Sequence, residues 1–283
     1  MTSVVVARTR VELGTFLADL PRPRAVVMTM GALHEGHLDL VRLAKERAET
    51  VVVTIFVNPL QFGPGEDFVE YPRRLDADIA ALDELGVDVV FAPSGGEIYP
   101  NDEPEVLINA GRMGEMWEGV SRPGHFDGVL TVVAKFLHIT QPDIAVFGEK
   151  DAQQLALIQR MVADLDFPVE IVGAPTARSP EGLALSSRNA YLDEVERAQA
   201  HSLWTAISAA RENVTRGADA VRDAALAVLT DAEGVELDYL ALVDVLTLKE
   251  VEPDHRGEAL LLIAAKVGTT RLIDNALLRL GAS

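Results

Sequence analysis

Apolar, β-branched runs alternate with helical patterns through the first 175 or so residues, and this alternation limits the fold more than any other feature. Five runs are predicted to be strands buried on both faces, at 25–29, 51–57, 87–93, 144–148 and 169–175. Four amphipathic segments separate them, near 37–49, 75–85, 128–140 and 151–165. Strand alternating with helix predicts a parallel sheet with right-handed crossovers.

The pattern changes after residue 176. Residues 193–231 contain two helical stretches split by "TRGAD", and the segments "VELDYLALVD" and "ALLLIAAKVGTTRLIDNALL" read as strands with a turn at "VGTT". We therefore predict an α/β protein. A doubly wound, Rossmann-like nucleotide-binding domain would occupy 1–176, and a smaller α+β domain at 177–283 would close over the active site.

Composition narrows the class of protein. Cysteine is absent, which excludes disulfides, thiolate metal sites and cysteine nucleophiles. The N-terminus is charged too early for a signal peptide, and no apolar run reaches the length of a membrane span. Forty-four acidic residues against 25 basic ones give a net charge of −19, which argues against nucleic-acid binding. We expect a cytoplasmic protein with no nucleic-acid or membrane partner.

Two histidines, His34 and His37, stand where the first of the five runs gives way to a helix. Parallel sheets bind ligands beyond the carboxyl ends of their strands, and a helix N-terminus attracts anions. Gly31 permits a sharp turn, and Gly36 leaves room for a phosphate. "HEGH" lacks the spacing of the zincin motif, so an anion site is favoured over zinc. Two incidental histidines remain the alternative.

Polar residues also follow the next strand, in "FVNPLQFGPGEDFVEYPRR". The amides of Asn58 and Gln61 suit the orientation of hydroxyl and carboxylate groups. The stretch after them is predicted to be a mobile loop, with Tyr71 and Arg73 able to close over a ligand. A plain surface loop is the alternative interpretation.

Two later segments carry positive charge toward a possible nucleotide. "FGEKDAQQ" places Gly148 and Lys150 at a strand end, and "GLALSSRN" places Ser186, Ser187 and Arg188 on the connection between the two predicted domains. An ammonium, two hydroxyls and a guanidinium suit phosphate groups. Ordinary helix caps are the alternative for both segments.

The motif H-x-G-H, followed by a basic serine loop, resembles the nucleotidyltransferase superfamily that includes class I aminoacyl-tRNA synthetases. More narrowly, "TMGALHEGH", "FVNPLQF", "RPGHFDGVLTVV", "FGEKDAQQ" and "LALSSRN" together resemble the pantothenate synthetase family, and the similarity covers nearly the full chain. The resemblance implies a homodimeric ligase that uses ATP and Mg²⁺ to join (R)-pantoate to β-alanine. The reaction would pass through pantoyl adenylate and release AMP and pyrophosphate.

The resemblance also implies roles for individual residues. The expected catalytic residues are His37, His34, Lys150 and Arg188. The expected ATP-binding residues are Met30, Gly31, Ala32, Leu33, His34, Glu35, Gly36, His37, Gly148, Glu149, Lys150, Asp151, Ala177, Leu185, Ser186, Ser187 and Arg188.

The remaining expected roles concern the acid, the amine and the metal. Gln61 and Gln154 would bind pantoate, and Gln61 would also contact β-alanine. Arg122 and His125 would lie near the reacting end. An acidic cluster after "YPRR" is interrupted by Ala77, which leaves Asp78 as the candidate protein ligand of Mg²⁺. Magnesium otherwise rides mainly on nucleotide phosphates.

Two other functions fit parts of this pattern. An adenylyltransferase or related ligase acting on another small carboxylic acid would use the same first motifs, and amine-dependent release of AMP separates it from the ligase above. A non-catalytic nucleotide-binding regulator would bind ATP without exchanging pyrophosphate.

Overall fold

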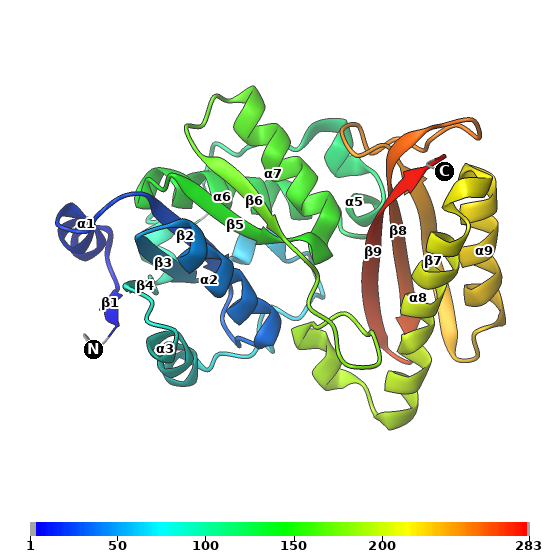
Figure 1. Ribbon diagram of the computed structural model, residues 1–283. Helices are drawn as coiled ribbons and strands as arrows, with labels where there is room; N and C mark the ends of the chain where they lie inside the picture. Colours follow the sequence, from blue (N-terminus) through cyan, green and yellow to red (C-terminus); the bar gives the residue numbers. More distant parts are fainter. Residues whose placement is uncertain (1–3, 103, 282–283) are drawn as a thin grey trace. The chain divides into compact units, whose positions relative to one another are not determined.

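The computed structural model describes residues 4–102 and 104–281, and the chain forms two compact units in it (Figure 1). The first unit extends to Glu149 and also includes Leu157–Pro175. The second unit comprises Lys150–Ala156 and the chain from Thr176 onward. Each unit has its own hydrophobic core.

The first unit is built on a six-stranded sheet whose strands are all parallel, in the order β1-β4-β3-β2-β5-β6. The strands are β1 (Val5–Ala7), β2 (Arg24–Thr29), β3 (Thr50–Ile55), β4 (Val89–Phe91), β5 (Ile144–Gly148) and β6 (Glu170–Ala174). The chain moves outward from β2 to β3 and β4, and then crosses to β5 on the other side of β2. This reversal puts the topological switch point at the carboxyl ends of β2 and β5.

Helices cover both faces of this sheet (Figure 1). The α-helices are α1 (Arg10–Ala18), α2 (Glu35–Arg47), α3 (Leu75–Glu84), α4 (Gly95–Ile98), α5 (Glu118–Ser121), α6 (His125–Thr140) and α7 (Ala152–Asp164). Three short 3₁₀ helices are η1 (Pro59–Gln61), η2 (Gly111–Glu115) and η3 (Glu149–Asp151). Val41 of α2 packs with the strand residues Val27 and Val53. Phe136 of α6 meets Phe91 edge to face, with ring centroids 6.1 Å apart.

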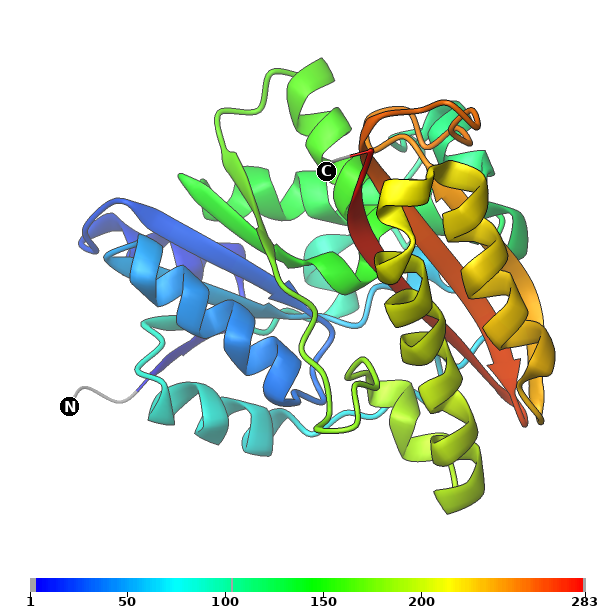
Figure 2. The same cartoon turned by 45° about the vertical axis from the view of Figure 1, so that its right-hand side comes forward.

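The second unit is an antiparallel sheet with two long helices on it, α8 (Glu194–Glu212) and α9 (Ala218–Asp231) (Figures 1 and 2). Its strands β7 (Val235–Val243), β8 (Gly257–Val267) and β9 (Thr270–Leu280) lie in sequence order. Two 3₁₀ helices, η4 (Ser187–Tyr191) and η5 (Val214–Arg216), flank α8. Alternate residues of β9, including Leu272 and Leu278, join the core beneath the helices.

The predicted fold class is confirmed: a doubly wound parallel sheet precedes a smaller α+β part. The five predicted strands are β2 to β6, and the four amphipathic segments are helices. The strand β1 was not predicted, because three residues at a sheet edge give almost no periodic signal. The helix α1 was not predicted either, and it buries only Leu13 and Leu17, which gives a weak amphipathic pattern. Burial of the last run on both faces was wrong, since Glu170 is exposed on the edge strand β6. Within residues 4–102 and 104–281, every helix is too short or too polar to cross a membrane.

Candidate functional site

The turn after β2 is held in place by hydrogen bonds to one buried carboxylate, that of Asp78. Gly31 and Ala32 both adopt positive φ, 85° and 51°, which turns successive amides in one direction. Asp78 of α3 receives them: its Oδ2 accepts from the Ala32 amide at 2.9 Å, and its Oδ1 accepts from the Leu33 amide at 2.8 Å. A Cβ on Gly31 would lie 3.0 Å from the Asp78 Oδ2, so the close approach also favours glycine.

The two histidines stand at the first turn of α2. His34 is the N-cap, and the ring centroids of His34 and His37 lie 4.1 Å apart. The His34 amide donates to the His37 Nδ1 at 3.3 Å, so a neutral His37 carries its proton on Nε2 and can donate from there. The amides of Glu35 and Gly36 belong to the first helical turn, which supplies them with no intrahelical acceptor. Two rings and a helix N-terminus therefore meet at the switch point.

Three of the expected ATP-binding residues have partners within the protein. The Glu35 side chain is exposed and pairs with Arg42 at 2.6 Å. The amides of Ala32 and Leu33 point at Asp78 rather than at a phosphate.

Asp78 does not fit the part of a magnesium ligand. Its side chain is buried, and both oxygens accept backbone N–H groups. In the described part of the chain, no three histidine, aspartate or glutamate residues form a group that could hold a metal ion. The structure instead gives Asp78 the task of fixing the turn, and its assignment to Mg²⁺ is not carried further.

A buried amide network orients Gln61. The Nδ2 of Asn58 donates to the Gln61 Oε1 and to the Gly128 carbonyl, both at 3.1 Å. The Tyr99 hydroxyl donates to the Asn58 Oδ1 at 2.9 Å, and burial raises the pKa of Tyr99, which keeps this hydroxyl a donor. The Gln61 Nε2 is left 3.2 Å from the Met30 sulfur, a weak acceptor. Asn58, expected to face a ligand, works inside the protein and fixes which end of Gln61 is presented.

The "RPGHF" residues converge on the same place. Arg122 donates to the Gln61 carbonyl at 3.2 Å and to Glu66 of the following loop at 2.9 Å. His125, at the start of α6, has its Nδ1 2.8 Å from the Gln61 carbonyl. Gly128 allows this convergence, because a Cβ there would lie 2.2 Å from the Leu60 carbonyl oxygen of η1.

The loop between Phe62 and Arg74 has an interior of its own. Phe62 contacts Phe68 and Tyr71 with ring centroids 5.3 and 5.9 Å apart. Arg73 donates to loop carbonyls, including that of Tyr71 at 3.0 Å. Tyr71 and Arg73 therefore hold the loop together here, whereas the sequence suggested that they reach over a ligand.

A cavity of about 360 Å³ opens beside this loop at the carboxyl ends of the strands. Met30 and Gly31 form part of its wall, together with Arg8, Arg73 and Arg74. These guanidinium groups supply positive charge where a chain of net charge −19 would otherwise repel an anion. The two histidines and Gln61 do not belong to its lining.

In the second unit, Lys150 lies in η3 and its Nζ is 3.3 Å from the Asp151 carboxylate. The side chain of Lys150 is 21% exposed, so its ammonium is within reach of a ligand. Gln153 is buried in the first turn of α7, and Gln154 is half-buried beside it.

The residues Ser186, Ser187 and Arg188 (the serine segment) follow a short hairpin formed by residues 177–185. The Leu185 amide donates to the Ala177 carbonyl at 2.9 Å, and the chain then enters η4. Ser186 caps η4, since its hydroxyl accepts from the Arg188 amide at 3.3 Å. The capping interpretation therefore holds for the Ser186 hydroxyl, while Ser187 and Arg188 begin the helix itself.

Comparison with known proteins decides the family. The model of the family described as Pantoate-beta-alanine ligase matches residues 6–277. The chain belongs to this family. As a member of the ligase family it is an AMP-forming enzyme that joins pantoate to β-alanine through an amide bond.

Individual relatives agree with this assignment. The chain is 55% identical over 280 residues to a pantothenate synthetase of Acidothermus cellulolyticus, covering 97% of this chain and 92% of the relative. A crystal structure of pantothenate synthetase from Thermus thermophilus superposes with a TM-score of 0.90 at 45% identity, covering 96% and 99% of the two chains. The pantoate-beta-alanine ligase of Francisella tularensis, complexed with "Beta-gamma ATP and Beta-alanine", gives a TM-score of 0.79 at 34% identity and 97% coverage of both chains.

Sequence reasoning missed the residues that hold the ligase's candidate groups in place. Asp78 was singled out from the sequence, but as a metal ligand and not as the support of the turn after β2. Among the residues that were not singled out, Tyr99 supports Asn58 in the first unit, and Arg178, Asp274 and Asn275 support the candidate groups of the second. None of them lies inside a recognisable motif. The available signal was a polar pair, "DN", inside the otherwise apolar stretch "LIDNALL".

Proposed function

We propose that the chain makes pantothenate in two steps on residues of the motifs above. The pantoate carboxylate attacks the α-phosphorus of ATP, which forms pantoyl adenylate and releases pyrophosphate. The amine of β-alanine then attacks the acyl carbon, which forms the amide and releases AMP. The observation that carries this proposal is the fixed turn at the switch point, where two imidazoles and helix N-terminal amides meet.

The first step needs charge neutralisation more than it needs a base, because the nucleophile is already ionised. We assign His34 and His37 to the phosphates, with the Nε2 of His37 as a donor. Lys150 and Arg188 would stabilise the charge that builds on departing pyrophosphate. The complex of the Francisella relative supports ATP as the nucleotide. The wider proposed ATP-binding set is Met30–His37, Gly148–Asp151, Ala177 and Leu185–Arg188.

Pantoate has hydroxyl and carboxylate oxygens that accept hydrogen bonds. Gln61 presents its Nε2 donor end, because Asn58 already occupies the Oε1. We therefore assign Gln61 to pantoate and to β-alanine beside it, and Gln154 to pantoate. Mg²⁺ would enter with ATP as part of the substrate, bound to the phosphates. A homodimer, which the family resemblance implies, and a cytoplasmic location, which the sequence composition favours, stay predictions.

Pyrophosphate exchange tests this proposal. Exchange of labelled pyrophosphate into ATP should require pantoate and no β-alanine, and other small hydroxy acids should support it poorly. Release of AMP should require β-alanine as well. Exchange that appears only when both substrates are present would contradict the two-step scheme, and ATP binding without any exchange would favour a regulator.

A further inference from the structure

The strand β9 carries two adjacent polar residues, Asp274 and Asn275, that are both buried. Neighbouring side chains on a strand point to opposite faces, and Leu272 and Ala276 of the same strand lie in the core beneath the helices. Asp274 shares that face, so Asn275 lies on the other. Buried polar groups are almost always hydrogen-bonded, which makes their partners informative.

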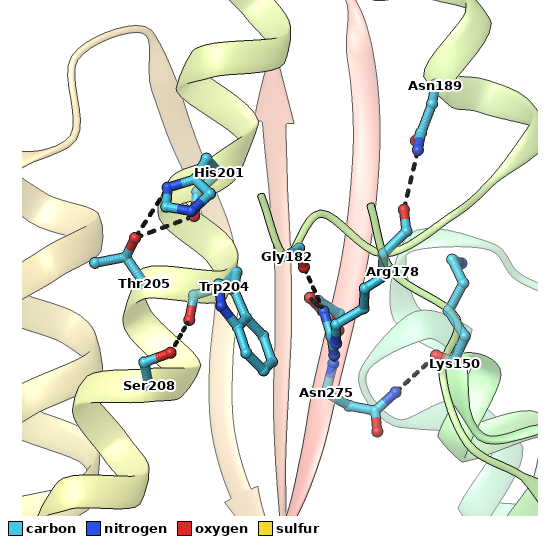
Figure 3. A network of polar contacts seen from close by, with 11 residues as sticks. Lys150, Arg178, Gly182, Asn189, His201, Trp204, Thr205, Ser208 and Asn275 are labelled. Atoms are coloured by element: carbon cyan, nitrogen blue, oxygen red, sulfur yellow. Dashed lines mark hydrogen bonds and ion pairs between the residues drawn. The ribbon is translucent and has the colours of Figure 1, made fainter. Parts of the chain in front are cut away.

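Asp274 forms an ion pair with Arg178 of the hairpin that leads to the serine segment. Its carboxylate accepts from both terminal nitrogens of Arg178, at 2.6 and 2.8 Å, and its side chain is only 2% exposed. Arg178 also donates to the Gly182 carbonyl at 3.0 Å, and its guanidinium lies 4.2 Å from the Trp204 ring centroid (Figure 3). Gly182 itself fits against Trp204, since a Cβ there would lie 2.2 Å from the ring.

Further contacts connect the hairpin to the start of η4. Ala184 pairs with Arg178 across the hairpin, and its carbonyl accepts from the Asn189 side chain at 3.0 Å (Figure 3). The segment from Ser186 to Arg188 lies between these two fixed points. Asp274 therefore determines where the serine segment starts, without being part of it.

Asn275, on the other face of β9, forms a hydrogen bond with a different segment, the one that contains Lys150. Its Nδ2 donates to the main-chain carbonyl of Lys150 at 2.7 Å (Figure 3). A bond to the backbone fixes the origin of the Lys150 side chain and leaves the ammonium to act on a ligand. The backbone N–H of Asn275 also donates to the Asp274 carboxylate at 2.7 Å, so the contacts of the two residues are connected.

We propose that Asp274 and Asn275 form a positioning pair for adenylate formation. They hold the ammonium of Lys150 and the serine segment with Arg188 in one frame, so that both cations are placed before pyrophosphate departs. This inference rests on the phosphate roles proposed above for Lys150 and Arg188. Neither member of the pair is among the residues assigned above to the substrates. A displacement of about 1 Å in a group that acts on the transition state can cost about 10²-fold in rate.

The variant Asn275→Asp tests the pair, because it keeps the size and shape of the side chain and replaces the donor with an oxygen. We expect single-turnover formation of pantoyl adenylate to fall about 10- to 100-fold. Amide formation from supplied pantoyl adenylate should stay within about threefold of wild type, since no pyrophosphate charge develops in that step. Equal losses in both half-reactions, or no loss in either, would overturn the proposal.

Two further variants keep the test decisive. Asn275→Ala removes the donor without adding charge, and it takes over the test if circular dichroism shows that Asn275→Asp is unfolded. Asp238→Asn is the matched control, because it removes the ion pair of Asp238 with Arg271 (2.7 Å) on the same sheet and should leave both half-reactions unchanged. Wild-type enzyme without pantoate-dependent exchange would refute the proposed function itself. An active wild type with an unselective Asn275 variant refutes only the positioning pair.

Discussion

The turn from Gly31 to His37 (the histidine turn) and the serine segment are proposed to bind the same nucleotide, yet different contacts hold them in place. The turn leaves a central buried strand, and one carboxylate 46 residues away, Asp78, fixes its amides. The serine segment leaves a hairpin whose anchor, Asp274, lies 96 residues beyond Arg178. A parallel sheet places strand ends by topology alone. A hairpin has no such guide, so its position depends on a buried ion pair with a distant strand.

Loss of either histidine should have a large effect on catalysis and little effect on folding. We expect His34→Ala and His37→Ala each to lower turnover by roughly 10²–10³, the typical cost of removing one preorganised transition-state donor. Steady-state assays with saturating substrates measure this, and circular dichroism checks the fold. Variants with nearly wild-type turnover would remove the histidines from the phosphate site.

The anchor of the histidine turn is tested by Asp78→Ala. Two buried amides would lose their acceptor, and each unsatisfied group costs about 1–3 kcal/mol, so urea unfolding should show a loss of about 3 kcal/mol. Asp78→Asn keeps one acceptor oxygen and should lose less. The loss should be the same with and without Mg²⁺. A loss that appears only when Mg²⁺ is present would restore Asp78 as a metal ligand.

The same contrast explains how much the sequence could predict. Apolar runs such as 51–57 predict buried parallel strands. The residues that follow these strands include His34, Gln61 and Lys150, so the sequence alone places them at the same edge of the sheet. The inner supports are different. The sequence shows Asn58 as a polar residue after a strand and Asp78 as one acidic residue in a predicted helix. It does not show that Asn58 is 1% exposed or that Asp78 faces backbone amides. The Arg178–Asp274 pair depends on three-dimensional packing that no local pattern records.

Gly182→Ala tests how tightly the hairpin is held. The new methyl group would meet Trp204 and would also strain a φ of 96°, which should cost about 1–3 kcal/mol in the free energy of unfolding. Gly257→Ala is the matched control, because Gly257 has a φ of 107° with open space around the added atom. Urea unfolding followed by tryptophan fluorescence compares them. Equal losses would show that Trp204 does not restrain the hairpin.

A smaller effect is expected at the loop beside the histidine turn. Glu66→Gln weakens the ion pair with Arg122, whose two side chains are 24% and 19% exposed. Limited proteolysis should then cut faster between Phe62 and Arg74, by about two- to fivefold if the pair contributes roughly 0.5–1 kcal/mol. Saturating ATP with pantoate should slow the cut in both proteins. Identical rates in wild type and variant would leave the loop held by its aromatic cluster alone.

The smallest effect is expected away from both segments, at Asp143. A hydrogen bond from Arg22 lowers the pKa of Asp143 in the folded protein. A depressed carboxyl pKa stabilises the fold above the unfolded value of about 3.9, and this contribution is lost as the pH falls through the folded pKa. Asp143→Asn should therefore cost less than about 1 kcal/mol at pH 7, since the pair is exposed, and should flatten the loss of stability below about pH 4. Urea unfolding between pH 2 and pH 7 checks this, and an unchanged acid limb would contradict it.

The most direct test of the account measures both half-reactions of Lys150→Met. This change keeps the apolar stem and removes the ammonium, so the fold should be preserved. Single-turnover rapid quench should show adenylate formation slowed by about 10²–10⁴. With preformed pantoyl adenylate, amide formation from β-alanine should stay within about tenfold of wild type, a difference of ~1.4 kcal/mol. If the two half-reactions fall together, Lys150 does not act on departing pyrophosphate, and the separation of phosphate chemistry from amide formation is contradicted.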